Sequence, residues 1–172
     1  MKRIICLLVC LLAGPANANL ITNGDFTSGN TAGWTLTGGD YTDASSGYFT
    51  AYDNSGWGII SQDISTNAAY NYDLSFDTYA GQISGNQFAW AVDGVMTTIA
   101  TTTSWVTNTA MFAGTGAVTN VAFYYATGGG SGVWNMDNVS VTQGAAAVPE
   151  PASLALFGLS LAGLLWSRRK KA

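Results

Sequence analysis

Residues 70–78 read YNYDLSFDT, and this stretch decides the fold class. Aromatic and aliphatic side chains stand at positions 70, 72, 74 and 76, whereas polar side chains stand at 71, 73, 75 and 77. Successive side chains of a β-strand point to opposite faces, so an alternation of period two predicts a strand with one buried face. An amphipathic helix would instead repeat its apolar side chains every three to four residues.

The same alternation recurs along the chain from residue 19 to residue 143. Gly, Asn, Asp and Ser separate the alternating stretches, and Asp93-Gly94 is a typical hairpin turn. Short strands at this spacing predict an all-β antiparallel sandwich, with Trp34 and Trp90 in its core. We expect strands near residues 20–26, 34–37, 47–52, 57–64, 70–79, 87–92, 95–100, 104–112, 118–125 and 133–142.

Charge is distributed very unevenly along the chain. All six basic residues lie at its two ends, whereas the stretch from 19 to 148 has no Lys, Arg, His, Cys or Glu. That stretch contains nine Asp, which gives it a formal charge of −9. A domain without basic side chains cannot neutralise the phosphates of a nucleic acid, so we expect no nucleic-acid partner. The expected charge partners are calcium ions and positively charged surfaces.

The same composition argues against catalysis. Without His, a Ser nucleophile lacks its usual base, and Cys6 and Cys10 both lie in the N-terminal segment that we expect to be removed. A pair of carboxylates, as in glycoside hydrolysis, is the remaining option. Asp73 and Asp77 share one strand face but stand about 13 Å apart by strand rise, too far for such a pair. Other Asp pairs stay open, but nothing in the sequence marks one out, so we predict a noncatalytic protein.

The N-terminal residues 1–18 have the three parts of a secretory signal peptide. Lys2 and Arg3 form a positive start, and residues 4–13 form a short apolar core. Ala16 and Ala18 supply the small-x-small pattern before a cleavage site, which we place after Ala18. The predicted partners at this stage are the Sec machinery and signal peptidase.

The C-terminal residues form a second targeting segment, which a linker over 144–148 joins to the domain. A proline-rich motif precedes an apolar stretch over 152–166, which predicts a transmembrane helix. Fifteen residues at helical rise reach only about 22 Å, so flanking residues must cover the rest of the bilayer. The basic end is expected to stay in the cytoplasm. The motif is Val148, Pro149, Glu150 and Pro151, and the basic cluster is Arg168, Arg169, Lys170 and Lys171.

This tail, residues 149–171 with its motif beginning at 148, resembles the PEP-CTERM sorting domain of Gram-negative bacteria. The resemblance implies recognition by exosortase, a transient membrane anchor and removal of the tail. It further implies a domain that is periplasmic in the precursor and later lies at the cell surface or in the extracellular matrix. A plain tail anchor is the alternative, but it does not explain why Pro-Glu-Pro stands directly before the helix.

A second resemblance covers the domain, residues 19–143. Residues 19–26 (NLITNGDF), 33–35 (GWT) and 134–141 (WNMDNVSV) resemble the opening and closing strands of carbohydrate-binding-module jelly rolls, which are galactose-binding-like sandwiches. The resemblance implies a structural Ca²⁺ where these strands meet, held by Asn23, Asp25 and Asp137. Thr27 stands where that family often has an acid. The alternative is that Asp25 is a turn residue and Asp137 a strand-edge acid.

Exposed aromatic side chains are the candidate glycan contacts, because they stack on sugar C–H faces while Asp and Asn bond hydroxyl groups. Trp57 stands in the loop sequence NSGWG, next to Asp53 and Asn54. Tyr124 falls on the outward face of its predicted strand. These four residues form the predicted glycan site, and the alternative for Trp57 is a place in the core.

Together, these features predict a noncatalytic exported protein of the cell surface or extracellular matrix. We expect exosortase to sort it, and we expect it to be associated with exopolysaccharide in biofilms. A glycan-binding, lectin-like module is one alternative. An O-glycosylated coat protein, indicated by the many Ser and Thr, is the other.

Overall fold

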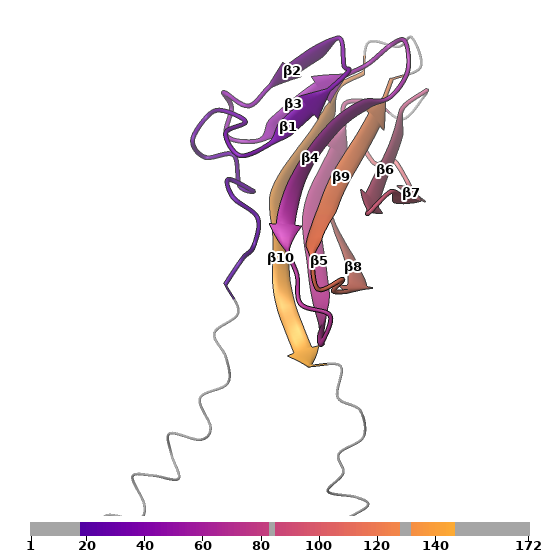
Figure 1. Cartoon of the computed structure of the whole chain (residues 1–172). Helices are drawn as coiled ribbons and strands as arrows, with labels where there is room; N and C mark the ends of the chain where they lie inside the picture. The colour runs from indigo at the N-terminus through magenta and orange to yellow at the C-terminus, as the bar shows by residue number, and fades with distance from the viewer. Residues whose placement is uncertain (1–17, 83–84, 128–131, 147–172) are drawn as a thin grey trace, which may run out of the picture.

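The computed structural model describes residues 18–82, 85–127 and 132–146. These residues form two antiparallel sheets packed face to face, as the alternating sequence predicts (Figure 1). Residues 1–17 of the signal peptide, residues 147–148 of the linker and the sorting tail lie outside the described residues, whereas residues 144–146 of the predicted linker are the end of a strand. In the part of the chain that is described, no helix has the length and apolar character needed to cross a membrane.

Each sheet has five strands, and every neighbouring pair is antiparallel. In spatial order, sheet A consists of β1 (Thr35–Thr37), β4 (Gly58–Ser65), β9 (Val118–Ala126), β6 (Gln87–Val92) and β7 (Val95–Ile99). Sheet B consists of β2 (Tyr41–Asp43), β3 (Phe49–Tyr52), β10 (Trp134–Ala146), β5 (Tyr70–Ala80) and β8 (Val106–Ala113).

The core fills the space between the two sheets. Phe123 of β9 is fully buried, and its ring lies 4.9 Å from the ring of Phe76 on β5 and 6.3 Å from that of Phe88 on β6. Leu74 and Phe76 both point inward, which confirms the face predicted for residues 70–78. Trp34 is buried as expected, whereas Trp90 is only partly buried against the core.

The predicted strand over 20–26 is wrong. The segment forms turns, because Asn23 and Phe26 have positive φ angles of 53° and 48° that a strand does not allow. It still lies along β10: the Leu20 N–H donates to the Val141 carbonyl over 2.8 Å. Gly24 approaches β10 so closely that a Cβ there would collide with a backbone carbonyl oxygen. Strand β2 was not predicted, since its three residues are too few to show an alternation.

The turn between β6 and β7 confirms the predicted hairpin. Asp93 and Gly94 have φ angles of 47° and 80°, the two positive values that a type I′ turn requires. Val92 pairs with Val95 across this turn.

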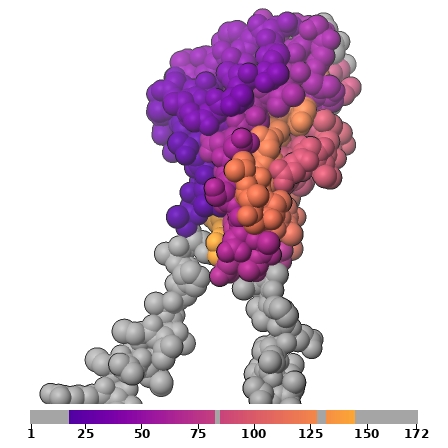
Figure 2. Space-filling view, viewed as in Figure 1, coloured from indigo at the N-terminus to yellow at the C-terminus, as the bar shows by residue number. Residues whose placement is uncertain are grey.

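The two chain ends of the domain lie at the same end of the sandwich (Figure 1). The first described residues and the end of β10 therefore lie close to the same end of the domain. The space-filling view shows the purple part of the chain, which includes β3 and the start of β4, at the opposite end of the molecule, above β9 and β6 (Figure 2).

Candidate functional site

The outer surface of sheet B carries a group of aromatic rings, which we call the aromatic face. Strand alternation places them there: Phe49 and Ala51 of β3 point inward, as do Thr78 and Ala80 of β5, so their neighbours point outward. The aromatic face consists of Tyr41, Tyr48, Tyr52, Tyr79 and Trp105.

Trp105 stands just before the edge strand β8 and contacts two other rings of this face. Its ring centroid is 5.7 Å from that of Tyr48 and 5.7 Å from that of Tyr79, so three rings extend from the start of β3 to β8. Tyr41 and Tyr52 form a separate stacked pair at 5.4 Å. Trp105 remains 47% exposed. The face spans the width of sheet B, about 19 Å at ordinary strand spacing, and is wide enough for more than one sugar ring.

Polar side chains lie between the rings. Asp43 pairs with Thr50, Thr50 with Asn135, and Asn135 with Tyr79 across four neighbouring strands. The Thr50 hydroxyl donates to Asn135 Oδ1 over 2.8 Å. Hydrogen bonds from the Ser45 hydroxyl and N–H lower the pKa of Asp43, which keeps this carboxyl ionised.

Two carboxylates face each other in the next row. Asp77 of β5 is directly opposite Asp137 of β10, an arrangement that destabilises a sheet when both are charged. Asp77 accepts hydrogen bonds from the Thr107 hydroxyl (2.6 Å) and from Asn138 Nδ2 (2.9 Å), and Asp137 accepts one from the Asn138 N–H (2.7 Å). Burial, followed by the charges of Asp77 and Asp25, raises the pKa of Asp137.

Replacing Asp137 by Asn is expected to raise Tm at pH 7 in the presence of EDTA by about 1–3 °C. A raised native pKa means that the protonated acid favours folding at low pH and that this contribution is lost as pH rises through the native value. Asn keeps the acceptor for Asn138 but removes the repulsion, so the difference should vanish below pH 3.8, the ordinary value. Thermal unfolding across pH measures both effects, and an unchanged or lower Tm at pH 7 would contradict this account.

The predicted glycan site is only partly assembled. Trp57 and Tyr124 lie together on the outer side of sheet A, with ring centroids 6.2 Å apart. Asp53, however, is only 5% exposed, and its carboxylate accepts the N–H groups of Gly39, Ser55 and Gly56. These bonds, that of Ser55 foremost, lower the pKa of Asp53.

Asp53 therefore holds the loop that carries Trp57, and its carboxylate is buried by that loop. The Asn54 side chain also has a structural partner, since its Oδ1 accepts the Thr127 hydroxyl over 2.8 Å. What the structure adds is Trp105, whose partners Tyr48 and Tyr79 are distant in the sequence.

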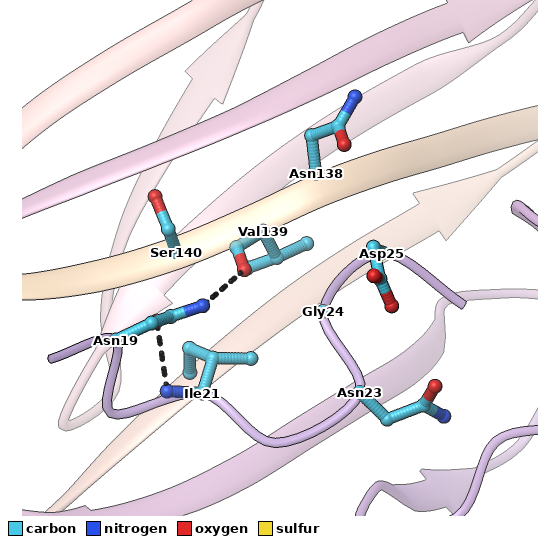
Figure 3. A pocket seen from close by; sticks show the side chains of 8 residues that line it. All are labelled: Asn19, Ile21, Asn23, Gly24, Asp25, Asn138, Val139 and Ser140. Carbon is cyan, nitrogen blue, oxygen red and sulfur yellow. Dashed lines mark hydrogen bonds between the residues drawn. The ribbon is translucent and has the colours of Figure 1, made fainter. Parts of the chain in front are cut away.

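Two residues of the predicted calcium site, Asn23 and Asp25, line a pocket between the N-terminal segment and β10, whereas the third, Asp137, is not among its lining residues (Figure 3). Asn23 Oδ1 already accepts the Ser28 hydroxyl over 2.7 Å, and its amide donates to the carbonyls of Asn30 and Ala32. Asp25 Oδ1 accepts the Thr27 hydroxyl. Figure 3 shows the side chains of Asn23 and Asn138 pointing away from each other.

These side chains do not form the shell of six to eight oxygens that Ca²⁺ needs. Among residues 18–82, 85–127 and 132–146, no three acidic, Cys or His side chains gather in a metal-binding group. Asp25 and Asp137 are close enough for their charges to interact, so calcium would depend on these two and on backbone carbonyls. Calcium binding stays a prediction, and a rise in Tm on adding Ca²⁺ that Asp137→Asn abolishes would support it.

Comparison with known proteins bears on the tail and on the domain separately. Residues 147–170 match the PEP-CTERM protein-sorting motif. This motif implies processing by exosortase and a precursor that is anchored in the membrane. No curated protein is significantly similar to the chain in sequence.

The domain is similar in structure to carbohydrate-binding modules. The xylan-binding domain CBM22-1 of Paenibacillus barcinonensis Xyn10C is 18% identical with a TM-score of 0.55, and the match covers 78% of this chain and 100% of that one. TmCBM61, solved with β-1,4-galactotriose, is 17% identical with a TM-score of 0.56, over 74% and 99% of the two chains.

The enzymatically active domain of tailspike protein 4 from bacteriophage CBA120 is also similar, at 14% identity and a TM-score of 0.60. This match covers 73% of the present chain but only 21% of the tailspike chain. At these identities the likeness shows the fold alone. The chain thus carries a PEP-CTERM sorting motif behind an antiparallel sandwich that has the fold of carbohydrate-binding modules.

Proposed function

We propose that this protein is a noncatalytic, exosortase-sorted surface protein whose sandwich binds glycan through the aromatic face. The observation that carries the proposal is the contact of the exposed Trp105 ring with Tyr48 and Tyr79 on the outside of sheet B. The sorting motif supports export, and the fold is one on which carbohydrate-binding modules are built.

The chemistry of the face suits sugars. Aromatic rings offer flat apolar surfaces to the C–H groups of a pyranose, and the neighbouring Thr50 and Asp43 offer partners for hydroxyl groups. Tyr79 lies on a strand of sheet B, and Tyr48 and Trp105 stand directly before β3 and β8 and pack on one another, so the surface is formed before a ligand arrives. A preformed surface loses less conformational entropy on binding.

Catalysis is not part of the proposal. Asp77 and Asp137 are opposed across β5 and β10, but Thr107 and Asn138 hold them with hydrogen bonds. No Lys, Arg or His in residues 19–148 is available to act with them. Incubation with a bound glycan should therefore release no reducing ends.

The test of glycan binding is an array of neutral, basic and acidic oligosaccharides probed with the full chain in detergent. We expect binding to at least one class and weaker binding after Tyr79→Ala. Absence of binding to every glycan would contradict the proposal. Binding that is lost with Trp57→Ala but not with Tyr79→Ala would instead place the site at Trp57 and Tyr124.

Sorting has its own expected result. In a host that carries an exosortase, the chain should lose its tail, whereas Glu150→Ala should accumulate as a membrane-bound precursor. Ser153→Ala, a nearby substitution within the apolar stretch that leaves the motif intact, is the control and should be processed normally. Intact mass of the membrane and released fractions measures both, and equal processing of Glu150→Ala and the wild type would contradict exosortase recognition through this motif.

The final destination follows from sorting and binding together. We propose that the domain is periplasmic in the precursor and then lies at the cell surface or in a matrix that contains exopolysaccharide. The O-glycosylated coat protein remains the alternative, and it predicts a mature mass above that of the bare polypeptide.

A further inference from the structure

The aromatic face is surrounded by negative charge only. Asp43, Asp77 and Asp137 all point to the outer side of sheet B, as the outward neighbours of inward core residues on β2, β5 and β10. The hydrogen-bond donors to these carboxylates, which come from Ser45, Thr107 and Asn138, are all neutral. Residues 19–148 contain no Lys, Arg or His, so the domain itself has no cation to bring to this face.

This arrangement ranks ligands by charge. An acidic glycan would bring carboxylates against carboxylates, which is repulsive at every separation that the face allows. A neutral glycan would stack on Trp105 but leave the charges of Asp77 and Asp137 uncompensated. A cation would compensate both, and it would also be attracted by the electron-rich faces of the rings.

We propose that the aromatic face takes a glycan with free amino groups, such as a chain of glucosamine units, whose ammonium groups lie against Asp77 and Asp137 while its sugar rings stack on Trp105. This inference rests on the proposed function and names the substrate class of the same site. Two features of the site favour it independently, the aromatic rings and the carboxylates.

The position of the carboxylates relative to the rings supports the proposal. Asp137 lies two residues after Asn135 on β10, and Asn135 pairs with Tyr79, the ring that contacts Trp105. Asp77 lies two residues before Tyr79 on β5. Since residues two apart on a strand share one face, about 7 Å from each other, an ammonium group of a stacked sugar can reach this pair.

Calorimetry on the full chain in detergent compares three tetramers: glucosamine, N-acetylglucosamine and galacturonate. We expect the glucosamine tetramer to bind at least tenfold more tightly than the N-acetylated one, with no measurable binding of the galacturonate. The preference should shrink as salt is added, because screening weakens the charge attraction.

Variants separate this site from general attraction to an acidic protein. Asp77→Asn combined with Asp137→Asn should remove at least tenfold of the affinity for the glucosamine tetramer and change that for the N-acetylated tetramer by less than twofold. The matched control is Asp63→Asn with Asp93→Asn, which removes the same charge from sheet A and its hairpin and should leave most of the affinity intact.

Three results would count against the proposal. Equal binding of the acetylated and free tetramers would overturn it while leaving glycan binding in place. Equal losses in the two double variants would also overturn it, because they would show attraction to net charge alone. Binding of no glycan in any form would remove the proposed function together with this inference.

Discussion

Replacing Phe123 by alanine is expected to lower the free energy of unfolding by about 3–5 kcal/mol. Its ring is fully buried and contacts Phe76 from sheet B, Phe88 from sheet A and Trp34 from the segment before β1. Removing it opens a cavity where three parts of the fold meet. Small domains are stable by only about 5–15 kcal/mol, so this one change is a large share of the total.

Urea unfolding followed by Trp fluorescence measures the loss. The matched control is Val118→Ala on the same strand, because Val118 is 63% exposed and its removal should cost less than about 0.5 kcal/mol. A loss below 1 kcal/mol for Phe123→Ala would mean that the two sheets do not pack as described.

Replacing Trp105 by alanine is expected to weaken glycan binding at least tenfold, or about 1.4 kcal/mol, without unfolding the domain. The ring is half exposed and packs on Tyr48 and Tyr79 on the outer surface of sheet B. Its loss therefore removes a ligand surface and leaves the core intact. Calorimetry with the tightest-binding oligosaccharide measures the effect, and circular dichroism checks the fold.

Trp57→Ala is the matched control for Trp105→Ala. It removes the same side chain from the opposite sheet, where Trp57 contacts Tyr124. Equal affinity of Trp105→Ala and the wild type would place the site elsewhere. A loss in Trp57→Ala alone would restore the site that the sequence predicted.

The fold class was readable from the sequence because burial leaves a local trace. In residues 70–78 every second side chain faces the core, and the sequence shows this as an alternation of apolar and polar residues. The hairpin at Asp93-Gly94 was readable for a similar reason, since its positive φ angles favour these residue types. Both features depend on neighbours in the chain.

The errors arose where the backbone departs from a regular strand. Residues 20–26 begin with Leu20 and end with Phe26, and Phe26 is indeed buried, but two residues with positive φ turn the chain out of the sheet. Strand β2 exists because Tyr41 and Asp43 pair with β3, and its own sequence carries no signal.

The candidate site was the least predictable part. Trp105 lies in a Thr- and Ser-rich stretch, and only the register of β3, β10, β5 and β8 brings its ring to Tyr48 and Tyr79. Asp77 and Asp137 become a pair through the same register. Asp53 was predicted as a glycan contact, but its carboxylate accepts hydrogen bonds from the backbone of its own loop. The sequence alone does not distinguish these two roles.

The most direct test of glycan binding at the aromatic face follows the indole N–H signals of the protein by NMR while a bound oligosaccharide is added. The sandwich contains five Trp, at positions 34, 57, 90, 105 and 134. The account predicts that the Trp105 signal shifts most and that those of the buried Trp34 and Trp134 hardly move. A dominant shift of Trp57, or no shift of any indole at saturating oligosaccharide, would contradict it.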